Sequence, residues 1–425
     1  MSLKASLVVA AISIAVSGIA VADEFPSMEM SGVTALSTGS TYWTADRKKA
    51  AKERVLFKDG EISAQVAGSS NLDFTRSRVT PRSANLASPY KAVGKLFFTE
   101  PGVGDFQCSA SIIRNRVIVT AAHCVFDPVA KSFFTNWVFI PAYDGGLSNP
   151  AGSQTSPQAP FGSWIARFVL VSATWSNTNG ALPNNGDFGL IVLQDQSFSG
   201  AAPVSVRTKV GASFTAVTNN LPNTHVTILG YPCNFNSCNI MQRDDSSDHR
   251  VGSTAAGNNA FEYGSDMTGG SSGGPWVQNF GDPASATPTG TRNLTRNAVV
   301  GVTSYGFLDT NVKVLGASGF NAEFASMLNA ACANATGNCW KGIDGRGTQE
   351  PRRRPPWRCT AATIGGPLPS ASPPSHPPRS EEGGVHVISA NRVDASRARR
   401  AGAVGEFRVT CGRPPRHRCF RLCAA

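Results

Sequence analysis

The sequence predicts an all-β fold, either a barrel or a sandwich, on two observations. Short apolar runs recur between about residues 89 and 340, and Gly, Pro and Asn separate them, a spacing typical of β-strands and turns. The composition agrees, because 41% of the 425 residues are hydrophobic and only 16% are charged, with 42 Gly and 27 Pro. These values support a sizeable core, and they exclude a wholly disordered chain and disfavour a helical bundle or coiled coil.

Seven apolar runs are the expected strands, and one segment is an expected helix. The strand runs are Val93–Phe98, Ser111–Thr120, Trp137–Ile140, Ala166–Val171, Phe188–Leu193, Val226–Gly230 and Val299–Ser304. The segment Ala322–Ala331 has helical character and is expected to close the domain. The length allows about two or three domains, and no internal repeat is visible.

The first residues have the pattern of a secretory signal. Lys4 precedes an apolar run, Leu7–Ile19, and the small residues Ala20–Ala22 follow it. The run is shorter than the about 20 residues that a membrane-spanning helix needs, so we expect residues 1–22 to be a signal peptide that is removed after Ala22, with a retained anchor as the alternative. Secretion would place the 10 cysteines in an oxidising compartment, where disulfides are expected.

The rest of the chain divides by composition into three parts. Residues 23–87 are polar and are interpreted as a pro-segment, residues 88–340 as the main domain, and residues 341–425 as a disordered Pro/Arg-rich tail. Three alternatives for the tail remain open: it binds polyanions, it results from an error in the reading frame, or it is a small module with disulfides among Cys359, Cys411, Cys419 and Cys423.

The net charge of +11 lies almost entirely in the tail. Residues 341–425 hold 16 of the 39 basic residues and 6 of the 28 acidic residues, so the preceding part of the chain is nearly neutral. The basic balance therefore gives no reason to expect that the main domain binds nucleic acid. We expect this domain to be a monomer without a membrane anchor.

Three short motifs contain the residue types that acyl-transfer chemistry needs. His123 ends an apolar run in Thr120-Ala121-Ala122-His123-Cys124, and an imidazole can take and return a proton near neutral pH. Asp187 precedes the apolar run Leu190–Leu193, where a half-buried carboxylate can orient an imidazole. Taken singly, the histidine can be a core residue and the aspartate a turn residue.

The third motif is a stretch of small residues around two serines, Gly269-Gly270-Ser271-Ser272-Gly273-Gly274-Pro275. Glycines lack a Cβ, so backbone N–H groups there can approach a substrate carbonyl and form an oxyanion hole. Taken alone, such a stretch is also typical of a turn or linker.

In the order His, Asp, Ser, the three motifs resemble those of the chymotrypsin-like serine endopeptidases, over roughly Pro89 to Cys339. The resemblance implies two packed β-barrels with a site in the cleft between them and a short C-terminal helix. It also implies that Ser272 is the nucleophile, His123 the general base and then acid, and Asp187 the residue that orients His123. The N–H groups of Gly270 and Ser272 would form the oxyanion hole, with neither metal nor other cofactor.

The cysteines fit this resemblance. It implies a disulfide between Cys108 and Cys124 that holds the histidine loop. The remaining cysteines before the tail form two close pairs, Cys233 with Cys238 and Cys332 with Cys339, which we expect to be local disulfides. Spacing alone does not prove this connectivity.

Two departures from the trypsin group point to another branch of the family. Ser271 stands where that group has an acidic residue before the nucleophilic serine, and no Ile-Val-Gly-Gly start precedes Val93. The chain looks more like the bacterial glutamyl endopeptidases, which share its Gly230-Tyr231-Pro232 turn. We therefore expect no activating ion pair and a removable pro-segment, with cleavage after Arg82.

Substrate preference depends on a few residues near the expected site. Asp266 lies six residues before Ser272, where resemblance to trypsin puts an anion that faces a substrate Arg or Lys, and Ser304 and Gly306 would lie beside the substrate. Glutamyl endopeptidases have a histidine in the following strand, and Val302–Gly306 contains none. The sequence thus favours Arg/Lys over Glu, with other preferences and a plain loop role for Asp266 left open.

The resulting hypothesis is a secreted serine endopeptidase, made as a pre-pro-protein, that cleaves polypeptides through an acyl-enzyme. The alternative is a catalytically silent binding protein on the same scaffold, since a fold does not guarantee a function.

Overall fold

The computed structural model describes residues 25–30, 42–58, 72–147, 155–219, 224–251, 260–283, 294–309 and 311–339. The expected signal peptide, the tail and the four tail cysteines lie outside these residues. Over the described ranges, no helix is long and apolar enough to cross a membrane.

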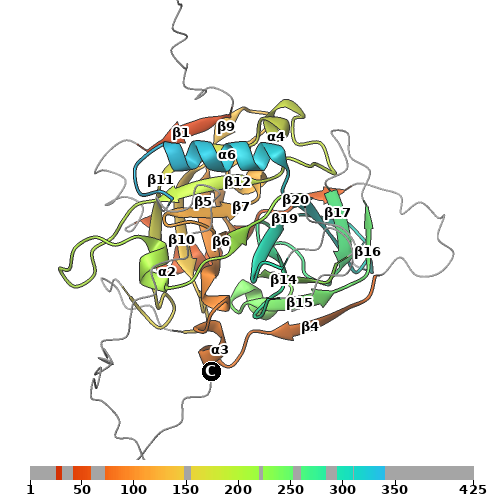
Figure 1. Cartoon of the computed structure of the whole chain (residues 1–425), viewed down its shortest axis with the longest axis horizontal. Helices are drawn as coiled ribbons and strands as arrows, with labels where there is room; N and C mark the ends of the chain where they lie inside the picture. Colours follow the sequence, from red (N-terminus) through yellow and green to blue (C-terminus); the bar gives the residue numbers. More distant parts are fainter. Residues whose placement is uncertain are drawn as a thin grey trace, which may run out of the picture. The chain divides into compact units, whose positions relative to one another are not determined.

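Six strands in the first half of the main domain form a closed barrel (Figure 1). The ring closes because β11 pairs with both β10 and β12. Around the ring the strands are β5 (Val93–Glu100), β6 (Gly104–Ile112), β7 (Val117–Thr120), β12 (Gly189–Leu193), β11 (Trp164–Val171) and β10 (Thr135–Pro141). Every residue of β7 and β12 is buried, which explains why these strands are uninterrupted apolar runs in the sequence.

The second half forms a curled sheet that stays open among the described residues (Figure 1). Its path runs through β16 (His249–Val251), β17 (Ala260–Gly264), β20 (Val314–Gly319), β19 (Ala298–Phe307), β18 (Pro275–Gln278), β14 (Val226–Gly230), β15 (Gln242–Ser246) and β4 (Phe74–Arg78). A smaller core of its own fills it, including Trp276, Tyr263 and Ile228. Together the two sheets confirm the predicted all-β architecture of two barrel-like halves.

The expected strand Ser111–Thr120 is wrong in its extent. The run contains the end of β6 and the whole of β7, which pair antiparallel as a hairpin with Ser111 opposite Val119. The polar residues Arg114, Asn115 and Arg116 form the turn between them, because their side chains do not fit a buried strand.

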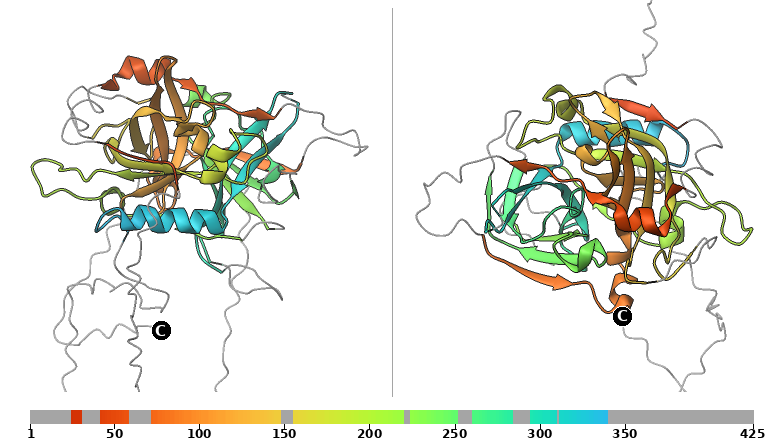
Figure 2. Two further views of the ribbon diagram at one scale, coloured as in Figure 1. Left: turned by 90° about the horizontal axis from the view of Figure 1, so that it is seen from above. Right: turned by 180° about the vertical axis from the view of Figure 1, so that it is seen from behind.

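Four strands come from the part of the chain that was interpreted as a pro-segment. β1 (Ser27–Glu29) pairs with β11 and β2 (Lys52–Glu53) with β6 of the first barrel. β3 (Phe57–Lys58) pairs with β19 and β4 with β15 of the second sheet. In the view from behind, the red segment that contains β2 and β3 passes from one half to the other (Figure 2).

The remaining elements are short, apart from the last helix. They are the strands β8 (Phe126–Asp127), β9 (Ser132–Phe133) and β13 (Thr215–Ala216), the helices α2 (Ala45–Ala50), α3 (Arg82–Asn85), α4 (Ala173–Asn177) and α5 (Val206–Val210), and the 3-10 turns η1 (Tyr90–Ala92), η2 (Ala122–Cys124) and η3 (Asn236–Cys238).

The predicted closing helix is present as α6 (Ala322–Ala333), which lies over β11 and β12 of the first barrel (Figure 1). Asn321 caps it by accepting the N–H of Phe324 at 3.0 Å. The Phe324 ring is fully buried between Phe188 and Phe320, with ring centroids 5.3 and 3.7 Å away. The helix therefore ties the end of the second half to the strand that follows Asp187.

We predict that Phe324→Ala lowers the free energy of unfolding by about 3–5 kcal/mol, because it removes a buried ring and leaves a cavity. Urea unfolding followed by tryptophan fluorescence measures this. Ser326→Ala on the exposed side of the same helix is the control, with an expected change within about 0.5 kcal/mol. Equal losses in both variants would contradict the packing role of Phe324.

Candidate active site

Strand pairing in the first barrel brings His123 and Asp187 together. His123 lies in η2, directly after β7, and Asp187 lies two residues before β12. These two strands pair antiparallel with Thr120 opposite Gly189, so the end of one meets the beginning of the other. Residues 64 positions apart in the sequence thus become neighbours.

The His123 imidazole is held by the Asp187 carboxylate in a site closed to solvent. Nδ1 of His123 lies 2.8 Å from Oδ2 of Asp187, and the backbone N–H of His123 donates to Oδ1 at 2.9 Å. The two side chains are 1% and 0% exposed. A carboxylate only accepts hydrogen bonds, so the neutral ring carries its proton on Nδ1 and presents Nε2 as an acceptor.

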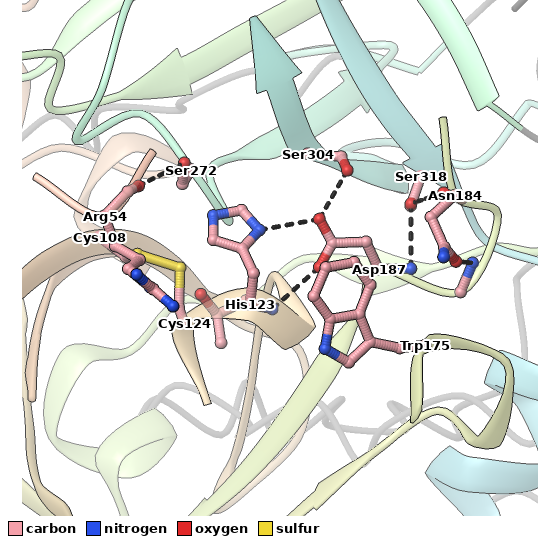
Figure 3. A network of polar contacts seen from close by, with 12 residues as sticks. Arg54, Cys108, His123, Cys124, Trp175, Asn184, Asp187, Ser272, Ser304 and Ser318 are labelled. Carbon is pink, nitrogen blue, oxygen red and sulfur yellow. Dashed lines mark hydrogen bonds and ion pairs between the residues drawn. A yellow bond between two sulfur atoms is a disulfide. The ribbon is translucent and has the colours of Figure 1, made fainter. Parts of the chain in front are cut away.

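Two serines of the second sheet complete the surroundings of Asp187, a role that no sequence pattern marks for either. Ser304 donates its hydroxyl to Oδ2 at 2.6 Å, and Ser318 accepts the backbone N–H of Asp187 at 3.2 Å (Figure 3). Ser318 in turn donates to the carbonyl of Asn184. The buried charge is thus compensated by donors from both halves of the domain.

The side chain of Ser304 is fully buried against the Asp187 carboxylate. Its expected contact with a substrate stays a prediction. Trp175 of α4 is a further neighbour that sequence reasoning missed: its ring centroid lies 6.3 Å from that of His123. Its role follows from tertiary packing, and no local pattern marks it.

Ser272 lies on the other side of the imidazole from Asp187 (Figure 3). It comes from the loop between β17 and β18, and its carbonyl accepts the N–H of Ser109 at 2.7 Å. Its hydroxyl donates at 3.1 Å to the carbonyl of Arg54. Nε2 of His123 is buried and has no hydrogen-bond partner among the described residues.

The glycine-rich loop has the backbone shape that its composition suggested. Gly270 and Gly273 adopt φ angles of +91° and +77°, and a Cβ at either residue would collide with neighbouring atoms. Ser109 donates its hydroxyl to the carbonyl of Gly270 at 2.8 Å. The N–H groups of Gly270 and Ser272 donate no hydrogen bond within the described ranges.

Ser271 is accommodated within its own loop. Its side chain is buried, and its hydroxyl donates to the carbonyl of Thr268 at 2.6 Å. A hydroxyl is uncharged, so Ser271 cannot form the ion pair that an acidic residue at this position would make with a chain terminus.

The structure contains the three disulfides that were expected. Cys108 of β6 is joined to Cys124 of η2, which fixes the turn that carries His123. Cys233 is joined to Cys238 and Cys332 to Cys339. Although Cys108, His123 and Cys124 lie close enough to hold a metal, both sulfurs are bonded to each other and are not available as thiolate ligands.

A pocket of about 250 Å³ opens beside Ser272. It is lined by Asp266 and Met267, by Gly306 of β19, and by Val55 and Leu56 of the N-terminal part. Asp266 and Gly306 thus lie at the pocket, as expected for residues that contact a substrate.

Asp266 is already engaged in an ion pair that the sequence did not reveal. Nε of Arg76 lies 3.2 Å from its Oδ2, although the two residues are 190 positions apart. Arg76 belongs to β4, and its guanidinium stacks over Phe235 at 3.9 Å. The other carboxylate oxygen of Asp266 is buried and unpartnered among the described residues. Arg76 thus neutralises much of the negative charge at this end of the pocket.

A second carboxyl group, Asp244, is buried next to this pair. Ser265 donates its hydroxyl to Oδ2 of Asp244 at 2.6 Å, while Oδ1 has no partner in the described chain. Burial, together with the nearby charge of Asp266, raises the pKa of Asp244 to about 7.

Comparison with known proteins identifies the family. A family model described as Trypsin matches residues 83–330, more than half of the chain. The chain belongs to the trypsin family.

Known relatives of this trypsin-family chain are distant. Glutamyl endopeptidase from Bacillus licheniformis is 24% identical over 231 residues, which are 54% of this chain and 61% of that protein. The chain therefore spans less than two thirds of the length of this relative. Two solved structures each align with 58% of this chain and 98% of their own, with a TM-score of 0.45. They are a thermostable serine protease from an extremophilic microorganism, 25% identical, and protease Anisep from Arthrobacter nicotinovorans, 23% identical.

The raised pKa of Asp244 leads to a prediction about stability and pH. A carboxyl whose pKa is raised on folding keeps its proton in the native state, so its contribution to stability is present below pH 4 and is lost as pH rises to 7. Asp244→Asn should gain stability over the wild type in this window by about 1.4 kcal/mol per pH unit. Urea midpoints between pH 4 and 7 measure it, and a constant difference would contradict the assignment.

Proposed function

We propose that this chain is a serine endopeptidase that hydrolyses polypeptides through an acyl-enzyme on Ser272. The observation that carries the proposal is the buried pair of His123 and Asp187, whose geometry leaves Nε2 free on the side where Ser272 lies (Figure 3). The arrangement supplies a nucleophile, a base and a group that orients the base.

We assign one group of the site to each step of the reaction. His123 Nε2 takes the proton of the Ser272 hydroxyl as Oγ bonds to the substrate carbonyl carbon. The N–H groups of Gly270 and Ser272 stabilise the negative oxygen that forms. The imidazolium, stabilised by Asp187, gives its proton to the amine as the C–N bond breaks. Water then attacks the ester with His123 again as base, which releases the acid and regenerates Ser272.

For specificity we propose a preference for Arg or Lys, based on Asp266 in the pocket. This preference requires that Arg76 no longer pairs with Asp266, because only a free carboxylate favours a cationic side chain. The second candidate is a preference for Glu. The Arg76 guanidinium, which pairs with the pocket residue Asp266, favours it, as does the similarity to a protein named glutamyl endopeptidase.

The disulfides and the position of Arg82 suggest how the protein matures. We propose that residues 1–22 direct secretion, which fits the disulfides, and that cleavage after Arg82 removes the pro-segment. The Arg82 side chain is 30% exposed in its ion pair with Asp144, and Ser83 after it is exposed, so the side chains on both sides of this bond reach solvent. The bond lies in the short helix α3, which must open before a protease can cut it. Such a cut would break the covalent link of Arg54 and Arg76 to the main domain.

We predict that Ser272→Ala lowers kcat of the processed protein about 10⁶-fold, and that Asp187→Asn lowers it about 10⁴-fold because the imidazole then has the wrong tautomer. Mass spectrometry of a cleaved peptide library measures both.

Labelling with a fluorophosphonate provides the control at the same loop. Ser272→Ala should lose the label, while Ser271→Ala should keep it, since the Ser271 hydroxyl contacts only its own loop. Processed protein that cleaves nothing and takes no label would favour the alternative of a silent binding protein on this scaffold.

We further predict that Asp266→Ser lowers kcat/KM for Arg and Lys substrates of the processed protein by at least about 100-fold, because the cation loses its partner. Asp309→Asn, in an exposed loop, is the control. If the wild type instead cleaves after Glu, the Arg/Lys preference is rejected and the second candidate is supported.

A further inference from the structure

Residues 42–58 form part of the cleft, and the first of them are anchored on the closed barrel. The Trp43 indole is 4% exposed, donates to the carbonyl of Asn136 at 2.6 Å and packs on Phe97 at 5.3 Å. Arg47 of α2 forms an ion pair with Asp105 at 2.9 Å, and Tyr42 donates to the same carboxylate at 2.7 Å. These contacts fix where the chain enters the cleft.

From this anchor the segment runs past Ser272 as an extended strand. Lys52 and Glu53 pair with β6, and the N–H of Arg54 donates to the carbonyl of Gln107 at 3.3 Å. The Arg54 carbonyl then accepts the Ser272 hydroxyl, and the carbonyl of Leu56 accepts the N–H of Gly306 at 3.1 Å. The segment therefore bonds to the first barrel, to Ser272 and to β19 in succession.

The direction of this strand is opposite to that of a cleavable substrate. In a substrate, the residue that fills the pocket also provides the carbonyl that Ser272 attacks, so the chain leads from the pocket to Ser272. Here the chain reaches Ser272 first, at Arg54, and the pocket afterwards, at Val55 and Leu56. The cleft thus binds its own chain in reverse.

The contacts of the Arg54 side chain and carbonyl agree that the peptide bond after Arg54 is not positioned for attack by Ser272. The Arg54 guanidinium lies 3.3 Å from Glu100 and over the rings of Phe106 and Phe134 at 5.5 and 5.4 Å. Its carbonyl oxygen, and not its carbon, faces the Ser272 hydroxyl as a hydrogen-bond acceptor. The hydroxyl that should donate to His123 is thereby diverted.

We propose that residues 42–58 are an intramolecular inhibitor that occupies the cleft in the reverse chain direction and so escapes cleavage there. The proposal rests on the proposed function for its biological meaning, since inhibition requires an activity. The placement of the segment itself is testable without any activity.

A disulfide trap in the full chain with Ser272→Ala tests the placement. An ideal Cβ at Gly269 lies 2.9 Å from Cβ of Glu53 and 2.4 Å from Cγ2 of Val55. The two Cβ atoms must therefore move apart slightly to reach the about 3.5–4.5 Å of a disulfide. Glu53→Cys with Gly269→Cys should therefore form a disulfide, seen by non-reducing peptide mapping. Lys52→Cys with Gly269→Cys is the matched control and should not, because adjacent residues of a strand point to opposite faces.

Amide hydrogen exchange tests the placement without the cysteine substitutions, in case a trap variant does not fold. In the full chain with only Ser272→Ala, the amides of Arg54 and Gly306 should exchange at least about tenfold more slowly than in the same protein with Trp43→Ala, which loosens the anchor. A disulfide from position 52, or no disulfide together with equal exchange, would overturn the placement.

Fluorophosphonate labelling then tests the inhibition. The full chain should be labelled at Ser272 at least about tenfold more slowly than its Trp43→Ala variant, because a site that is mostly occupied reacts only in its open fraction. Equal labelling rates, or cleavage between Arg54 and Val55, would reject an uncleaved inhibitor. A trapped disulfide without labelling of any form would instead keep the placement and reject the proposed endopeptidase.

Discussion

The buried carboxylate of Asp187 is the constraint on which the arrangement of the two halves depends. It accepts hydrogen bonds from the backbone and ring of His123 in the closed barrel and from Ser304 in the curled sheet, while its own N–H donates to Ser318. A charge that is fully removed from water is stable only if its hydrogen bonds are satisfied, so neither sheet can shift without leaving it unpaired. Packing of the two halves and orientation of the imidazole are thus consequences of one buried group.

At the pocket, by contrast, charge is balanced by a segment from outside the main domain. Asp266 faces Arg76 of β4, and Asp244 behind it has a raised pKa that favours its neutral form. Arg54, which also lies outside the main domain, contributes a carbonyl that accepts the Ser272 hydroxyl. Residues upstream of Arg82 therefore complete both the polar and the apolar surroundings of the site, and what this site recognises depends on whether they are present.

Sequence patterns predicted the parts of this protein that hydrophobicity or small side chains determine. The apolar runs marked the strands of the barrel, and the residues around His123, Asp187 and Ser272 stood out because glycine, alanine and buried strands surround them. Strand β4 could not be found in this way, because its side chains are mostly exposed and it is held by backbone hydrogen bonds to β15. Arg76 pairs with Asp266, and Ser318 contacts Asp187, in each case across more than a hundred positions of the sequence. Nothing in the local sequence distinguishes Arg76 or Ser318 from the residues around it.

The strands β1 to β4 are attached to the main domain by backbone pairing as well as by the covalent chain. Cutting one peptide bond after Arg82 leaves all of these hydrogen bonds intact, together with the buried Trp43. The onset of activity would then be governed by the dissociation rate of a bound peptide rather than by the rate of the cut. The opening of the cleft would then lag behind the cut by the lifetime of the bound N-terminal peptide.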